Sequence, residues 1–190
     1  MTSNNLYRAY SMEYGTFVGI SWAMIFLSYV YGVRTSNPLL FLLCFAMLGL
    51  GFILPLLFGF RINWKYARVN DKLSYIQGLF FAFNMFVFAC LLNGLTTYAY
   101  FEFFDEGMLT SGILKMFEEA NMMETYTQIG MGDSYKEMMA LLNEADSLSS
   151  LEKALIIFNN NFFYGCIMSF IVALLAAHNR RNVNPDSTNR

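Results

Sequence analysis

Four long apolar runs hold most of this chain, and they constrain its fold more than any other feature. None of the runs contains Lys, Asp or His, and they cover residues 14–31, 39–60, 75–101 and 155–177. Each is about as long as the roughly 20 apolar residues that a helix needs to cross a bilayer. Because hydrocarbon cannot satisfy free backbone N–H and C=O groups, such spans must be helical. The sequence therefore predicts an all-α membrane protein, built as a four-transmembrane-helix bundle.

We expect a single membrane domain over residues 1–190. Its expected spans cover about residues 14–33, 38–60, 74–101 and 153–178. Residues 102–152 are expected to form an extracytoplasmic amphipathic helical insertion between the third and fourth spans, and residues 179–190 a cytoplasmic tail. Only 14% of the residues are charged, against about a quarter in a soluble domain, which agrees with this division.

Charged residues are distributed unevenly between the spans, and this sets the expected orientation. Four basic residues lie in or beside the connection between the second and third spans, where they are candidates to face anionic lipid: Arg61, Lys65, Arg68 and Lys72. The insertion carries eleven acidic residues and two lysines, a net charge of −9. Basic connections stay in the cytoplasm. Both termini are therefore expected to be cytoplasmic, and the insertion is expected to lie outside.

Small residues recur at every fourth position on the first and fourth spans, which predicts close packing of helices. The residues expected at these helix contacts are Gly15, Gly19, Ala23, Gly165, Ser169 and Ala173. Such stripes serve contacts within one chain or contacts with a second copy. We expect them to lie inside the bundle.

Amide side chains inside the spans have two interpretations. Hydrogen bonding between helices is the commoner one. The alternative is a polar path for a small solute, lined by Gln77, Asn84 and Asn161. Asn93 is only loosely aligned with the first two on the same helix. No carboxylate, His or Lys lies in the middle of a span to carry protons or couple ions, so we favour hydrogen bonding.

The insertion carries two amphipathic patterns. Apolar residues repeat at i, i+3 and i+4 over Ile113–Met123 and over Tyr135–Leu142, which predicts two helices that each have one apolar face. Gly130 and Gly132 are expected to separate them.

Two sequence signals predict where helices begin. Ser134 with Glu137, and Ser149 with Glu152, have the spacing of a capping box. In that motif the serine side chain and the glutamate side chain each pair with a backbone N–H of the other residue. The first pair predicts the start of the second insertion helix, and the second pair predicts the start of the last span.

Residue types that usually carry catalysis or bind metals are scarce. The three cysteines lie far apart inside spans, and the lone histidine, His178, ends the fourth. Walker, dinucleotide and zinc-protease motifs do not occur. Seven methionines in the insertion are soft ligands suited to cuprous ion, but no His or Cys accompanies them, and adaptable packing is the preferred interpretation. We therefore expect no catalytic residue, no cofactor, no metal and no nucleic-acid partner, and we do not expect an enzyme.

The layout also resembles a known family. The chain combines a glycine-rich first span, an arginine-led connection that runs into Leu73-Ser74-Tyr75-Ile76, and an acidic helical insertion before the last span. In this it resembles small four-span inner-membrane proteins common in Bacteroidota, which are catalogued only as a domain of unknown function. The resemblance implies a multi-pass protein of the bacterial inner (cytoplasmic) membrane, and it supplies no catalytic residues.

These features favour a non-enzymatic interaction or structural/accessory protein that acts through its outer helices or by self-association. The expected partners are the lipid bilayer and either a second copy of the chain or another membrane or periplasmic protein. The alternative is a small transporter or channel subunit that uses the polar path. A membrane enzyme is third, because it would need a cluster of acid, base or metal-binding groups.

Reporter fusions test the predicted orientation. A reporter fused after Asn70 should report the cytoplasm and one fused after Asp133 the outside, because the basic connection and the acidic insertion are expected on opposite sides. A phosphatase and a fluorescent protein, each fused at both sites and assayed in intact cells, supply the measurement. The orientation is wrong if both sites report the same side.

Overall fold

The computed structural model describes residues 3–67, 73–119 and 121–177, and these residues form seven α-helices and no strand. The four long helices are α1 (Ser3–Thr35), α2 (Pro38–Ala67), α3 (Tyr75–Phe103) and α7 (Ser150–Ala177). The three short helices between α3 and α7 are α4 (Met108–Glu119), α5 (Met122–Gln128) and α6 (Gly132–Ser147). The prediction of an all-α fold is confirmed.

Each long helix contains a stretch of 28 or 29 residues that is long and apolar enough to cross a membrane. At about 1.5 Å per residue, such a stretch measures about 42 Å, which covers the hydrocarbon core and the headgroup regions. The stretches are Arg8–Thr35, Pro38–Lys65, Tyr75–Phe103 and Ser150–Ala177. The four predicted spans are therefore confirmed by length and composition. The predicted tail at 179–190, together with Arg68 and Lys72, lies outside the described residues.

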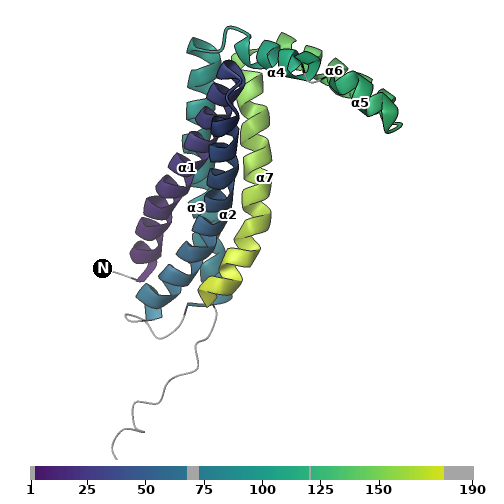
Figure 1. Cartoon of the computed structure of the whole chain (residues 1–190). Helices are drawn as coiled ribbons and strands as arrows, with labels where there is room; N and C mark the ends of the chain where they lie inside the picture. Colours follow the sequence, from purple (N-terminus) through teal and green to yellow (C-terminus); the bar gives the residue numbers. More distant parts are fainter. Residues whose placement is uncertain (1–2, 68–72, 120, 178–190) are drawn as a thin grey trace, which may run out of the picture.

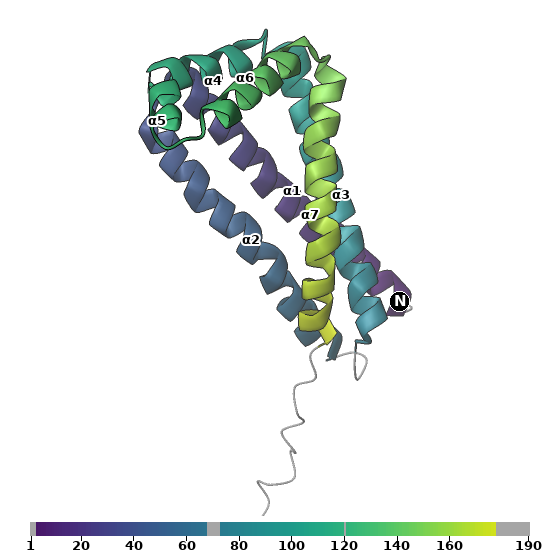
Figure 2. The same cartoon turned by 90° about the vertical axis from the view of Figure 1, so that its right-hand side faces the viewer.

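Helix α3 is the central helix of the bundle. It packs along α1 on one side and along α7 on the other, and it barely contacts α2 (Figure 1). Helix α2 packs instead on α1 and α7. Near the C-terminus of α7, helix α2 contacts α7: the Asn63 side chain of α2 donates a hydrogen bond to the Leu175 carbonyl of α7 at 3.3 Å. Toward the other end of the bundle, α2 diverges from α7 (Figure 2).

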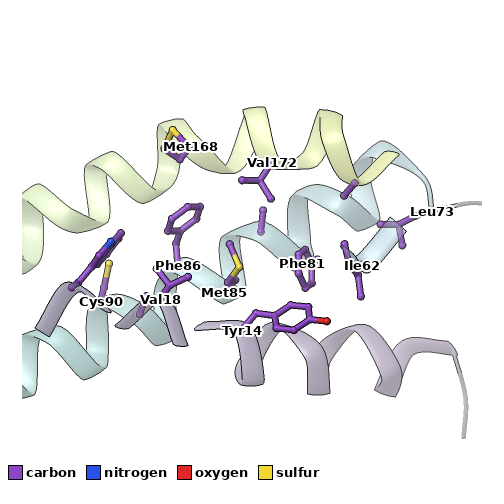
Figure 3. Close-up of a cluster of buried hydrophobic side chains, with 14 residues drawn as sticks. Tyr14, Val18, Ile62, Leu73, Phe81, Met85, Phe86, Cys90, Met168 and Val172 are labelled. Carbon is purple, nitrogen blue, oxygen red and sulfur yellow. The ribbon is translucent and has the colours of Figure 1, made fainter. Parts of the chain in front are cut away.

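The buried core lies on the two faces of α3 that meet α1 and α7 (Figure 3). On the α1 side, the Tyr14 ring stacks on Phe58 of α2, with centroids 4.3 Å apart, and meets Phe81 of α3 edge-on at 6.1 Å. On the α7 side, Val172 points toward α3 (Figure 3), and Met168 belongs to the same buried cluster. The core is apolar, so the bundle is held by close packing of side chains and backbones.

Glycines allow α1 and α7 to approach α3 closely. A Cβ atom added at Gly15 of α1 would lie 2.5 Å from the Met85 carbonyl oxygen and 2.8 Å from Phe88 Cβ. A Cβ atom added at Gly165 of α7 would lie 2.8 Å from Phe86 Cβ. All three separations are shorter than a van der Waals contact, so a larger residue at Gly15 or Gly165 would push the helices apart.

The other members of the two stripes lie on the same faces. Gly19 lies against Ala89 of α3, where an added Cβ would be 3.1 Å from the Ala89 Cα. Ala23, Ser169 and Ala173 are all buried, and the Ser169 hydroxyl donates to the Gly165 carbonyl at 2.7 Å within its own helix. The stripes of α1 and α7 thus serve helix packing inside one chain.

Helices α4, α5 and α6 form a unit that we call the arm (residues 108–147). The arm extends sideways from one end of the bundle, across the direction of the long helices (Figure 1). Its three helices meet at Tyr135, which is buried. The Tyr135 ring lies 6.4 Å from the Phe117 ring of α4 and 5.7 Å from the Tyr126 ring of α5. This small aromatic cluster gives the arm a core of its own.

The insertion contains three helices, where two were predicted. The chain breaks at Asn121, whose φ of 47° lies in the left-handed region. Asparagine tolerates this conformation better than most residues, so the first amphipathic pattern is divided between α4 and α5. The second break is at Gly130, with φ of 77°, where the sequence predicted that the helices separate.

Only one of the two predicted capping boxes forms. Helix α6 begins at Gly132 without a side-chain cap, because the tight turn at Gly130 leads directly into the helix, and Ser134 is already inside it. That prediction was wrong. The second box is confirmed: the Ser149 N–H donates to Glu152 Oε2 at 2.9 Å, and the Glu152 N–H donates to Ser149 Oγ at 3.3 Å.

Alanine substitutions test whether α3 packs this closely on α1 and α7. Gly15→Ala and Gly165→Ala should each lower the free energy of unfolding by about 1–3 kcal/mol, because the added methyl group has no room. Gly49→Ala is the matched control, since an added Cβ there has nothing within 4 Å. Unfolding of the purified protein in detergent, followed by circular dichroism, gives the comparison. Equal stability of all three variants would contradict the packing.

Candidate functional site

The three amides of the predicted polar path lie apart from one another. Gln77 pairs with Ser74 at the start of α3, where the Ser74 N–H donates to Gln77 Oε1 at 3.0 Å and the two residues form a capping box. Asn84 donates to the Phe80 carbonyl of its own helix at 2.8 Å. Asn161 lines a cavity between the long helices, and Gln77 and Asn84 do not line that cavity. The described residues therefore do not join these amides into a continuous polar path.

The cavity that Asn161 lines has a volume of about 550 Å³ and lies between α1, α2, α3, α7 and the arm. Its walls include Trp22 of α1, Leu48 of α2 and Tyr164 of α7. Leu109 of α4 also lines it, so the arm forms part of the wall. The cavity exists because α2 diverges from α7 at this end of the bundle (Figure 2). Its volume is typical of sites that hold small molecules.

Asn93 is the most buried polar side chain that lines this cavity. It is 2% exposed, it lines the cavity, and its Oδ1 has no hydrogen-bond partner among the described residues. A buried acceptor without a partner costs about 1–3 kcal/mol. The adjacent Gly94 allows Phe158 of α7 to pack close by, at 3.1 Å from an added Cβ. The sequence analysis described Asn93 only as loosely aligned with Gln77 and Asn84, and the glycine that follows it was the available signal.

A second polar centre, which the sequence analysis missed, lies where α3 leads into the arm. Asp105 is 2% exposed. Its Oδ1 accepts hydrogen bonds from the Tyr100 hydroxyl at 3.0 Å and from the Leu109 N–H at 2.9 Å. Its Oδ2 lies 3.9 Å from Lys153 Nζ of α7. One carboxylate thus connects α3, the start of α4 and the start of α7.

The chain around Asp105 is shaped to make this connection. Glu106 and Gly107 have φ of 44° and 75°, so the chain turns sharply between α3 and α4. At the same place, the Ser150 hydroxyl donates to the Phe101 carbonyl at 3.1 Å, which ties α7 to the last turn of α3. In the sequence, Asp105 was one of eleven acidic residues in the insertion, and nothing local distinguished it from the others.

The arm carries a groove of about 780 Å³ between its three helices. Its lining combines the methionines Met122, Met123 and Met139 with the carboxylates of Glu118 and Glu124. Methionine side chains adapt to partners of different shape. Both glutamates are exposed, so this surface is at once apolar and negatively charged.

The opposite end of the bundle is basic. Arg61 is exposed, and the Lys65 ammonium lies 4.1 Å from the centre of the Tyr10 ring, a cation–π contact that holds α2 near α1.

Among the described residues, no three His, Cys, Asp or Glu side chains gather as a metal site would require.

Comparison with known proteins gives one match. The family described as "Protein of unknown function (DUF4199)" matches residues 13–177. Searches of the curated proteins and of the solved structures gave no match. The matched region begins within α1 and ends with α7, so it contains most of the first span and all of the other three spans, the arm and the cavity. The chain therefore belongs to this family of proteins of unknown function, in which it is a member with four membrane-length helices.

Proposed function

We propose that this protein is a non-enzymatic interaction protein of the bacterial inner membrane, and that its arm binds a protein partner on the extracytoplasmic side. The groove between α4, α5 and α6 is the observation that carries this proposal. It offers adaptable methionine side chains beside two exposed carboxylates. Tyr135 is buried in the core of the arm, whereas Met123, Glu118 and Glu124 of the groove stay exposed.

The charge of the arm indicates the chemistry of the partner. Glu118 and Glu124 line the groove, and the insertion as a whole carries a net charge of −9. Anionic lipid headgroups would be repelled by this surface. A basic amphipathic segment of a protein fits it better, since its apolar face would meet the methionines and its Lys or Arg side chains the glutamates.

The attachment of the arm supports a binding role. Asp105 joins α3, α4 and α7 through buried contacts, so the arm is held in one direction relative to the bundle. A surface that is ordered before binding loses less conformational entropy when the partner binds. The bundle then serves as the membrane anchor that presents the arm.

The alternative, a small transporter or channel subunit, has less support. A solute path would need polar groups along the bundle, and Gln77 and Asn84 form hydrogen bonds within or beside their own helix. A catalytic role would need a cluster of acid, base and nucleophile, and among the described residues no three His, Cys, Asp or Glu side chains gather. Flux of a solute into liposomes that falls in Asn84→Leu would favour transport.

Site-specific photo-crosslinking tests the groove as a binding surface. A photoreactive amino acid at Met123, which is 58% exposed and lines the groove, should give one discrete adduct in intact cells. Leu141 is 60% exposed on α6 but does not line the groove, so the same probe there is the matched control and should give no such adduct. Reversing the groove charge with Glu118→Lys and Glu124→Lys should abolish the Met123 adduct.

The outcomes separate the competing interpretations. An adduct with the mass of two chains would favour self-association over a different partner. Identical adducts at Met123 and Leu141, or an adduct that persists after charge reversal, would contradict binding in the groove. The absence of any adduct at Met123 would contradict it as well.

A further inference from the structure

The cavity beneath α4 combines an apolar wall with a buried amide whose oxygen has no hydrogen-bond partner among the described residues. Asn93 Oδ1 is without a hydrogen bond among the described residues, in a side chain that is 2% exposed. Asn161 supplies a second amide to the same cavity. The other side chains discussed above, Trp22, Leu48 and Tyr164, give it large aromatic and aliphatic walls.

The depth of Asn93 rules out bulk water as its usual partner. Ten residues separate it from the end of α3 at Phe103, which is about 15 Å along the helix axis. The hydrocarbon core of a bilayer is about 30 Å thick, so Asn93 lies at hydrocarbon depth in a helix of membrane length. A molecule that dissolves in the lipid phase can carry a hydrogen-bond partner to this depth.

The lining also restricts the charge of an occupant. None of the described residues that line the cavity is a Lys, Arg, Asp or Glu, and a charge placed there would lose its hydration without compensation. A carboxamide presents one acceptor oxygen and one NH₂ donor. A hydroxyl group is a small neutral group that can donate to the first or accept from the second.

We propose that this cavity binds a neutral amphiphile from the lipid phase, a molecule with an apolar body and a hydroxyl group that pairs with the Asn93 amide. In this proposal the apolar body packs against the aromatic walls and enters between α2 and α7, which both line the cavity and diverge at this end of the bundle (Figure 2). The proposal rests on the cavity alone and holds whether or not the arm binds a protein.

The two tryptophans of the chain allow a direct test. Trp22 lines the cavity and Trp64 does not, so Trp64→Phe leaves one reporter in the site. A long-chain alcohol with bromine atoms along its chain, added to the full-length protein in lipid nanodiscs, should quench Trp22 fluorescence in a saturable manner. The brominated alkane of equal length has no hydroxyl group and should need a clearly higher mole fraction for half-saturation.

Substitutions assign the effect to Asn93. Asn93→Leu should weaken binding of the alcohol roughly fivefold to tenfold, as expected for one lost hydrogen bond, and should leave quenching by the alkane unchanged. Asn84→Leu is the matched control, because that amide is on the same helix but pairs with the Phe80 carbonyl. It should leave both probes unaffected.

Three results would overturn the proposal. The first is equal affinity for the alcohol and the alkane in the protein with native Asn93, a comparison that needs no variant at that position and decides the matter even if Asn93→Leu fails to fold. The second is unchanged alcohol affinity in folded Asn93→Leu. The third is quenching that rises linearly with mole fraction and is the same for Trp22 as for Trp64 in a Trp22→Phe variant, which would indicate partition into bulk lipid.

Discussion

The buried carboxylate of Asp105 is the contact on which the arrangement of the bundle and the arm depends. It accepts hydrogen bonds from Tyr100 of α3 and from the first turn of α4, and it faces Lys153 of α7. A buried charge is stable only when such partners surround it, and removing one partner of a buried pair is strongly destabilising. The three elements that meet at Asp105 are therefore fixed relative to one another. The direction of the arm and the part of the cavity wall that α4 supplies depend on this junction, together with the packing of α4 on α1.

The second constraint is the central place of α3. Glycines on α1 and α7 bring those helices close to α3, whereas α2 packs on α1 and α7 and barely meets α3. Because α2 also diverges from α7 at the arm end (Figure 2), the space that a fourth tightly packed helix would fill stays open there. The cavity is thus a consequence of helix packing. Its buried polar group is Asn93, whose amide oxygen has no hydrogen-bond partner among the described residues.

The sequence predicted the features that depend on composition and local spacing. Bilayer thickness sets the length of an apolar run, so four spans could be derived without coordinates, and the Ser149–Glu152 box could be derived from its spacing. Features that depend on distant residues meeting could not. Asp105 gains its role only when Tyr100, Leu109 and Lys153 surround it, and Asn93 is distinguished from Asn84 only by what the neighbouring helices offer. The break at Asn121 was missed because asparagine also occurs inside uninterrupted helices, so the residue type alone does not predict a left-handed conformation.

Hydrogen–deuterium exchange of an Asp105→Ala variant tests the role of this junction most directly. The change removes two hydrogen bonds and the partner of Lys153, while Asp133→Ala removes a carboxylate that is fully exposed on the arm and serves as the control. We predict that amides of α4 exchange roughly tenfold faster or more in Asp105→Ala, with the contact between α3 and α7 around Gly165 unchanged, and that Asp133→Ala exchanges as the parent protein does. Unchanged protection of α4 in Asp105→Ala would contradict the account, because the arm would then be held by something other than this carboxylate.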